Sequence, residues 1–217
     1  MGYADDLMQI AIVLYPGMTA LDAIGPYEVL SRLPGARVRF VAAEPGVVRT
    51  DNGFLGLSAD EARDGVTSAD ILVVPGGWGT RALAEDPDTL EWVRRIHETT
   101  KWTTAVCTGS LVLAAAGLLE GLPATTHWSQ MDLLERYGAV PTRERYVFAG
   151  ERLVTAAGVS AGIDLALALV AKIAGPELAQ GLQLGIEYDP APPFDAGSVD
   201  KAPPTVVAMV RAAMAAR

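Results

Sequence analysis

The sequence predicts an α/β fold with a doubly wound, mostly parallel sheet and helices on both faces. Residues 8–15 (MQIAIVLY) form a nearly unbroken apolar, β-branched run, as a strand buried on both faces of a parallel sheet requires. Such runs alternate along the chain with segments of helical periodicity, and several lead directly into glycine turns. With 217 residues, half of them hydrophobic, the chain can bury a sizeable core, so we expect one domain over residues 1–217.

The first half of the chain repeats the order strand, turn, helix. After the strand over residues 8–15, Thr19 can cap a helix that begins at Ala20. The pair Gly25-Pro26 is expected to break this helix and to start a second one. Further strands are expected over residues 38–43, 69–75 and 102–106, and helices over residues 87–99 and 108–119.

The second half continues the alternation. A strand over residues 154–157 leads through Gly158-Val159-Ser160 into an apolar helix over residues 161–174, which Gly175-Pro176 ends. Another helix is expected to follow, to about residue 185. The proline-rich residues 189–197 fit neither element, and residues 203–216 resemble a terminal helix.

Composition excludes several classes of protein. The net charge is −9, and no basic cluster exceeds the pair Arg94-Arg95, so no nucleic-acid partner is expected. No uncharged apolar stretch reaches membrane-spanning length, and residues 1–6 lack the basic start of a secretory signal. One cysteine and two histidines cannot form a disulfide or a thiolate zinc cluster, so we expect no metal and a cytoplasmic location.

Four segments are expected to converge on one pocket. In doubly wound sheets, ligands bind at the carboxyl ends of the strands. Asp22, residues 76–79, Cys107 and residues 158–160 each follow one of the expected strands.

Cys107, the single cysteine, is the candidate nucleophile. It stands between an apolar strand and an apolar helix, and the amides that open a helix supply positive potential that favours a thiolate. The alternative is that Cys107 is a small buried hydrophobic residue. Thr108, which follows it, offers a backbone N–H and a hydroxyl, or simply a helix cap.

Because residue 108 is not histidine, the acid or base beside the thiol is expected to be a carboxylate. Asp22 lies in an otherwise apolar setting, where desolvation can raise its pKa and let it move protons. The alternative is a first-turn aspartate that the helix dipole stabilises. His97 lies on the polar side of a helix and is read as a surface residue, whereas the role of His127 stays open.

The glycine turn Gly76-Gly77-Trp78-Gly79 lacks both the lysine of a P-loop and the spacing of a dinucleotide fingerprint. No nucleotide is therefore expected. The amides of Gly76 and Gly77 are candidates to stabilise a small developing charge, and a tight turn is the alternative.

Seven motifs together resemble the PfpI-type superfamily, which has the class I glutamine amidotransferase-like fold. Within it, their combination is most similar to the isocyanide hydratases. The motifs are residues 21–30 (LDAIGPYEVL), 74–77 (VPGG), 106–110 (VCTGS), 117–119 (GLL), 124–128 (ATTHW), 161–164 (AGID) and 187–194 (EYDPAPPF). The resemblance implies a flavodoxin-like sandwich with a nucleophile elbow and a homodimer whose active site lies near the dimer interface.

The resemblance also implies residue roles. Cys107 is the nucleophile, Asp22 is its partner, Thr108 helps to place the reacting groups, and Val159 stands at a hinge before a helix. The implied reaction hydrates a small apolar isocyanide to an N-formamide through a covalent cysteine thioimidate, without a cofactor.

Two alternatives stay open. One is a glyoxalase-like or other thiol-dependent lyase of the same superfamily. The other is a stand-alone small-molecule or redox sensor, because a similar module precedes the helix-turn-helix region of AraC-like regulators. The 217 residues leave no room for that DNA-binding region, so we expect none here.

Overall fold

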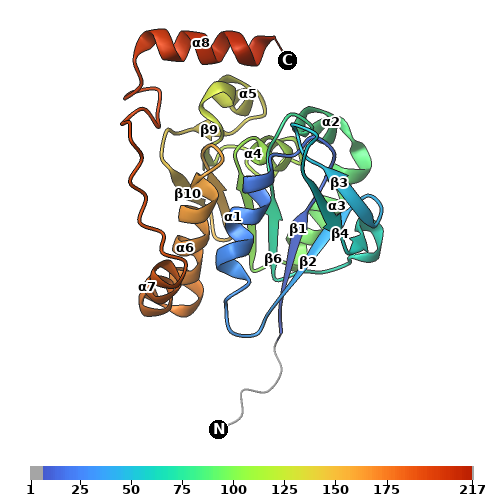
Figure 1. Cartoon of the computed structure of the whole chain (residues 1–217). Helices are drawn as coiled ribbons and strands as arrows, with labels where there is room; N and C mark the ends of the chain where they lie inside the picture. Colours follow the sequence, from blue (N-terminus) through green and yellow to red (C-terminus); the bar gives the residue numbers. More distant parts are fainter. Residues whose placement is uncertain (1–6, 217) are drawn as a thin grey trace. The chain divides into compact units, whose positions relative to one another are not determined.

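The computed structural model describes residues 7–216 (Figure 1). These residues divide into two compact units, one that ends at Ile186 and one that begins at Glu187. The prediction that no secretory signal is present concerns residues 1–6, which lie outside the described part of the chain.

The first unit is built on a seven-stranded sheet. All neighbouring strands are parallel except the pair at one edge of the sheet, Tyr146–Ala149 and Leu153–Ala156, which is antiparallel. Five of the parallel strands lie side by side in the order 2-1-3-4-5, when they are numbered by their order along the chain. This is the strand order of flavodoxin-like sheets. From edge to edge, the strands are β10 (Tyr146–Ala149), β11 (Leu153–Ala156), β7 (Trp102–Val106), β6 (Ile71–Val74), β1 (Met8–Val13), β2 (Ala36–Ala42) and β5 (Glu61–Ala62).

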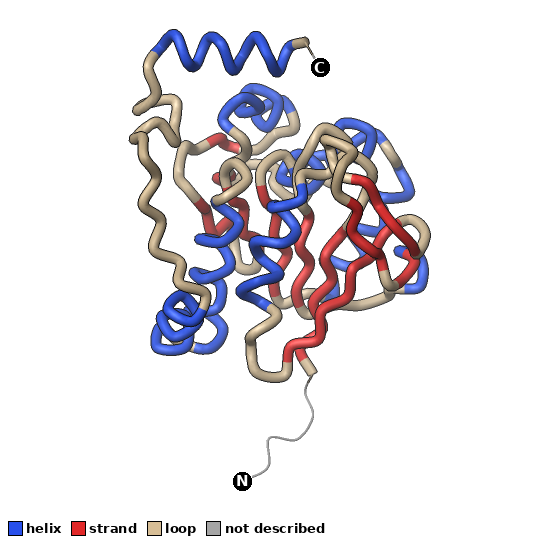
Figure 2. Tube along the Cα trace, in the orientation of Figure 1, coloured by secondary structure: helices blue, strands red, loops and turns tan. Residues whose placement is uncertain are grey.

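Helices cover both faces of this sheet, which Figure 2 shows as strands between two helical layers. On one face, α1 (Ala20–Leu30) packs against α6 (Ala161–Ala174), and α7 (Pro176–Gly185) packs on α6. On the other face lie α2 (Thr80–Glu85), α3 (Pro87–Thr99) and α4 (Gly109–Ala115). The predicted doubly wound, mostly parallel α/β fold is confirmed.

The central strands owe their burial on both faces to these layers. Every residue of β6 is buried, as are the last four residues of β1 and of β7. Their apolar runs therefore form the centre of the core, as the lack of alternation in the sequence predicts.

The expected break of the first helix at Gly25-Pro26 is wrong, because α1 runs unbroken from Ala20 to Leu30. The two residues instead make room for α6. A Cβ at Gly25 would lie 3.1 Å from Ile163, and one at Gly162 would lie 3.2 Å from the ring of Pro26. The packing of the two helices therefore outweighs the cost of a proline inside α1.

Several short elements were not expected. A hairpin joins β3 (Gly46–Arg49) to β4 (Gly56–Ala59), and a two-residue pair joins β8 (Pro123–Ala124) to β9 (Val140–Pro141). Other short elements are α5 (Met131–Arg136) and 3-10 turns at Arg63–Gly65 and Trp128–Gln130. The helix expected over residues 108–119 ends at Ala115, because Gly117 adopts a left-handed backbone with φ of 81°.

The second unit contains the helix α8 (Pro204–Ala215), preceded by an irregular, proline-rich segment, and both were expected. The single-domain organisation stays a prediction. Over residues 7–216 we find no helix with the length and apolar character needed to cross a bilayer.

Candidate active site

Cys107 forms a sharp elbow between β7 and α4. Its φ of 57° is in the left-handed region, which residues other than glycine seldom adopt. The turn is fixed from both sides, because the Cys107 N–H donates to the carbonyls of Ala156 and Ala157 at 3.1 and 3.0 Å. The Cys107 carbonyl accepts from the hydroxyls of Ser110 and Thr126 at 3.1 and 2.9 Å. These four hydrogen bonds hold a strained backbone that directs the thiol to the carboxyl end of the sheet.

Burial and hydrogen bonding act in opposite directions on the pKa of the Cys107 thiol. Its residue is only 5% exposed, and this burial raises the pKa of the thiol to about 12. The nearby Asp22 carboxyl raises this pKa further, while hydrogen bonds from the amides of Val159 and Thr108 to the sulfur lower it. The amide at the helix start thus acts in the expected direction, while burial and Asp22 act against it.

Asp22 lies in the first turn of α1 and is fully buried. Its Oδ2 accepts a hydrogen bond from the Gly76 N–H at 2.9 Å, whereas Oδ1 has no hydrogen-bond partner among the described residues. Burial raises its pKa from 3.8 to about 7; the Gly76 hydrogen bond and the Cys107 thiol lower it, and Asp51 raises it. The structure thus brings Asp22 beside Cys107, as a carboxyl that is half protonated near neutral pH.

These side chains meet where the order of the strands reverses. β1 lies between β2 and β6, so the connections that leave β1 and β6 diverge to opposite sides. Asp22 follows β1 and Gly76 follows β6, and Cys107 follows the adjacent β7. This crevice is the usual ligand site of doubly wound sheets.

The Gly76-Gly77 turn packs directly on Thr108. A Cβ at Gly76 would lie 2.5 Å from the Thr108 nitrogen and 2.9 Å from Asp22 Oδ2, so only glycine fits. The Gly77 N–H donates to Thr108 Oγ1 at 2.9 Å. Both glycine amides are therefore occupied, by Asp22 and Thr108. This differs from the expectation that they are free to stabilise a developing charge.

Val159 reaches the site through its backbone. Its amide hydrogen-bonds to the Cys107 sulfur, and its φ of 31° is a strained value for a β-branched residue. It lies directly before α6, after Gly158, whose Cβ position would be 2.7 Å from the His127 ring. The side chain of His127 therefore packs on the loop that carries Val159.

The two histidines differ in their location. His127 Nδ1 accepts from the Ser129 N–H at 3.3 Å, and burial lowers the pKa of its ring, so His127 is neutral beside the Val159 loop. His97 Nδ1 lies 2.9 Å from the Thr103 hydroxyl near the start of β7, at the end of the strand opposite Cys107. His97 is thus outside the candidate site, although it is half-buried rather than a fully exposed surface residue.

Two residues that the sequence did not single out complete the site. Thr80, at the start of α2, has its hydroxyl oxygen 2.8 Å from Thr108 Oγ1. The Tyr15 hydroxyl donates to the Pro75 carbonyl at 2.7 Å and lies 3.2 Å from Thr80 Oγ1. The only sequence signal for them is their position, directly after β1 and directly after the glycine turn.

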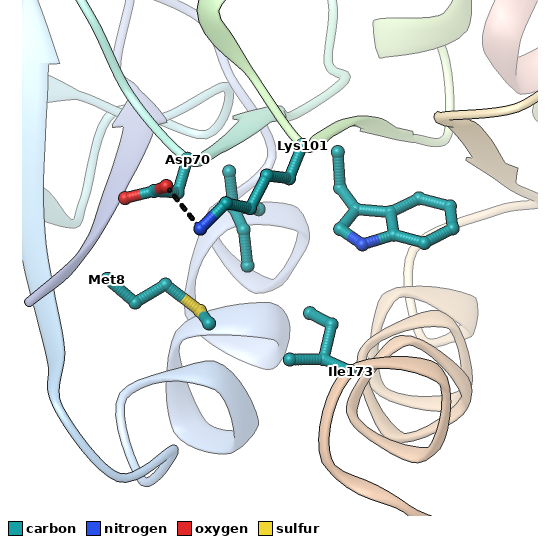
Figure 3. Close-up of a pocket in the computed structure, with 6 residues that line it drawn as sticks. Met8, Asp70, Lys101 and Ile173 are labelled. Carbon is teal, nitrogen blue, oxygen red and sulfur yellow. Dashed lines mark ion pairs between the residues drawn. The ribbon is translucent and has the colours of Figure 1, made fainter. Parts of the chain in front are cut away.

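No group of metal-ligating side chains occurs in the part of the chain that the structure describes. A cavity of about 220 Å³ lies at the opposite, amino-terminal end of the strands (Figure 3). Met8, Trp102 and Ile173 contribute apolar walls, and Lys101 pairs with Asp70 at 3.1 Å across it. Because it contains none of the candidate catalytic residues, this cavity is separate from the site.

Comparison with known proteins identifies the family. The model of the DJ-1/PfpI family matches residues 8–172. The chain belongs to the DJ-1/PfpI family. A ThiJ/PfpI family protein from Pseudomonas syringae has a crystal structure that superposes with a TM-score of 0.87 at 41% identity, over 98% of this chain and 87% of that one.

Two curated relatives differ in the share of their length that this chain matches. An isonitrile hydratase from Pseudomonas putida is 45% identical over 200 residues, which are 92% of this chain and 87% of that protein. The HTH-type transcriptional regulator CdhR from Pseudomonas aeruginosa is 34% identical over 174 residues, 77% of this chain but only 51% of the regulator.

Proposed function

We propose that this chain is an isocyanide hydratase, a hydro-lyase that adds water to R–N≡C and forms the N-formamide R–NH–CHO. The observation that carries the proposal is the pairing of the Cys107 thiol with a buried carboxyl, Asp22, whose pKa is about 7. The similarity to the isonitrile hydratase over most of both chains supports the same reaction.

In the first step, the isocyanide carbon accepts the Asp22 proton and the Cys107 sulfur attacks the same carbon. The thiol proton moves to the Asp22 carboxylate, so the site keeps its charge, and the product is the thioimidate R–N=CH–S–Cys107. The amides of Val159 and Thr108 that hydrogen-bond to the sulfur stabilise its developing negative charge.

In the second step, water adds to the thioimidate carbon. A proton passes through Asp22 to the nitrogen, and the tetrahedral R–NH–CH(OH)–S–Cys107 expels the sulfur, which recovers its proton. The products are R–NH–CHO and the free thiol. Asp22 Oδ1, which has no partner among the described residues, is the oxygen available to hold this water.

The shape of the substrate agrees with the burial of the site. An isocyano group is a linear pair of atoms with an exposed carbon, so it can reach the sulfur of a residue that is only 5% exposed. It carries no net charge and needs no ionic partner in an apolar pocket. Residues Cys107 and Asp22 supply the chemistry, so no cofactor is proposed.

The test is to incubate the purified protein with cyclohexyl isocyanide and to follow the formyl proton of N-cyclohexylformamide by NMR. We expect turnover by the wild type, none by Cys107→Ala, and a loss of at least about a hundredfold in Asp22→Asn, because general acid–base catalysis contributes this much. Asp132→Asn, at an exposed aspartate of α5, is the matched control. Absence of formamide with the wild type would refute the proposal.

Intact-mass measurement after rapid quenching tests the covalent step. We expect an adduct of one isocyanide on the wild type and none on Cys107→Ala. A parallel incubation with methylglyoxal tests the glyoxalase-like alternative, and consumption of methylglyoxal without isocyanide turnover would favour it. If neither substrate is turned over and oxidation modifies Cys107 alone, the result supports the sensor alternative.

We further propose that the chain is a single-domain homodimer in the cytoplasm, as the resemblance and the composition imply. Light scattering of the purified chain tests the dimer, and a monomer mass would contradict it.

A further inference from the structure

Thr80 stands at the start of α2 with 1% exposure, and its hydroxyl is directed into the active-site turn. Its Oγ1 donates to the Gly77 carbonyl. The same oxygen lies 2.8 Å from Thr108 Oγ1. Thr80 thus contacts both the glycine turn and the residue that follows the nucleophile.

Hydrogen bonds join both threonines to the peptide group of Gly77. Thr108 Oγ1 accepts from the Gly77 N–H at 2.9 Å. With the Thr80 hydrogen on the Gly77 carbonyl, Thr108 donates to Thr80 across the 2.8 Å contact. The Thr108 hydroxyl also lies 3.3 Å from the Gly77 carbonyl, so the reverse arrangement, in which Thr80 donates to Thr108 and Thr108 to that carbonyl, joins the same groups. The hydrogen bonds then close a ring from the Gly77 N–H through Thr108 and Thr80 to the Gly77 carbonyl.

Tyr15 closes the other side of Thr80. Burial raises the pKa of Tyr15 well above its ordinary value, so its phenol keeps its hydrogen, which goes to the Pro75 carbonyl at 2.7 Å. The Tyr15 oxygen, 3.2 Å from Thr80 Oγ1, therefore offers only an acceptor to Thr80. This contact with Tyr15 is longer than the contacts that Thr80 makes to the Gly77 carbonyl and to Thr108.

We propose that Thr80 is a positioning residue that holds the Gly76-Gly77 turn against Asp22 and Thr108. This inference rests on the proposed function, in which Asp22 moves the protons. The ring fixes the Gly77 peptide group, and the adjacent Gly76 N–H is the donor to Asp22 Oδ2 at 2.9 Å. The ring also uses the single hydroxyl hydrogen of Thr108. The group of Thr108 that hydrogen-bonds to the Cys107 sulfur is therefore its backbone amide.

The Gly76-Gly77 turn has little room to move within the site. At Gly76, the space for a side chain is already filled by Thr108 and Asp22. The Thr19 N–H also holds this turn, through the Gly76 carbonyl at 2.8 Å. We expect loss of the ring to free the Gly77 side of the turn and to lengthen the Gly76 hydrogen bond to Asp22. The other charged or titratable groups that act on Asp22 are the Cys107 thiol and Asp51, and neither is part of the ring.

The test compares Thr80→Val, which removes the hydroxyl at nearly constant shape, with Thr80→Ser, which keeps it. Thr104→Val is the control, because Thr104 is equally buried and donates to the Leu72 carbonyl at 3.0 Å, outside the ring. The titration of the Asp22 carboxyl is followed by ¹³C NMR and assigned by its loss in Asp22→Asn. Turnover of cyclohexyl isocyanide is measured for the same variants.

In Thr80→Val, we expect kcat to fall about tenfold with KM unchanged, the effect of one weakened hydrogen bond in the chemical step. We expect the pKa of Asp22 to rise by about half a unit or more, because its stabilising hydrogen bond is weakened. Thr80→Ser should restore both values, and Thr104→Val should change neither.

A Thr80→Val protein with the pKa and kcat of Thr104→Val would overturn the inference. If Thr80→Val does not fold, Thr80→Ala removes the same hydroxyl without a new methyl contact and is judged by the same criteria. The NMR titration needs no isocyanide. A wild type that fails to hydrate isocyanides would therefore contradict the proposed function, while the pKa comparison still decides the role of Thr80.

Discussion

Replacing Asp22 by asparagine should abolish activity and yet stabilise the fold at alkaline pH. Burial raises the pKa of this carboxyl from 3.8 to about 7, so the folded protein binds its proton more tightly than the unfolded chain does. Its contribution to stability is fully present below pH 3.8 and is lost as the pH rises through about 7. A gap of about three pKa units corresponds to about 4 kcal/mol at 1.36 kcal/mol per unit.

The asparagine variant does not titrate, and its side-chain oxygen can still accept from the Gly76 N–H. Integrating the proton linkage for these two pKa values gives about 2.5 kcal/mol lost by the wild type, relative to Asp22→Asn, between pH 5 and pH 8. Urea unfolding of both proteins at both pH values measures this double difference, in which groups common to the two proteins cancel.

Asp132→Asn, an exposed substitution, should show no such pH-dependent difference from the wild type. Parallel stability profiles for the wild type and Asp22→Asn would refute the reasoning, because they would mean that Asp22 has the same pKa in the folded and unfolded states. An Asp22→Asn protein that is less stable at pH 8 than at pH 5, relative to the wild type, would refute it as well.

Three further predictions concern the same site. In the wild type, kcat for isocyanide hydration should fall as the pH rises through about 7, because Asp22 must be protonated to act as the acid; a flat profile up to pH 9 would assign this role elsewhere. Gly76→Ala should cost about 1–3 kcal/mol in urea unfolding and nearly all activity, since its Cβ would lie 2.5 Å from the Thr108 nitrogen, and near-normal values would contradict the crowding. The free energy of unfolding of Val159→Gly should stay within about 1 kcal/mol of the wild-type value, because relief of a left-handed backbone offsets the lost side chain. Val154→Gly, at a fully buried residue of β11, should lower it by more than about 3 kcal/mol. Equal losses in the two variants would show that Val159 is unstrained.

The sequence predicted the sheet well because its signals are local. The apolar runs that became β1, β6 and β7 need two covered faces wherever they lie, and the glycine turns that follow them fix their ends. The unbroken α1 could not be predicted, because the fit of Gly25 and Pro26 on α6 depends on residues more than a hundred positions away. The β3–β4 hairpin lacks a long apolar run, so it gave no comparable signal.

In the candidate site, too, only the features with a local signal in the sequence could be predicted. Position after a strand was enough to single out Asp22, Gly76 and Cys107, since parallel strands bring their carboxyl ends together. The charge state of Cys107 depends on how completely the folded chain excludes water, which one segment cannot report. The role of Thr80 could not be predicted, because it depends on hydrogen bonds to a carbonyl and a hydroxyl. No residue near Thr80 in the sequence indicates these partners.

The burial of the Cys107 thiol affects which reagents the site can use. Burial raises the pKa of this thiol, which lowers the share of thiolate, the form with which peroxides and alkylating agents react. In the proposed mechanism, Asp22 and Cys107 act on one atom, which first takes a proton and then accepts an electron pair. The terminal carbon of an isocyanide is ambiphilic in this sense, whereas a carbonyl takes its proton on oxygen and its nucleophile on carbon. Under the proposed function, the pairing of Asp22 with the single cysteine of the chain therefore favours a substrate atom of this electronic character before any pocket shape is considered.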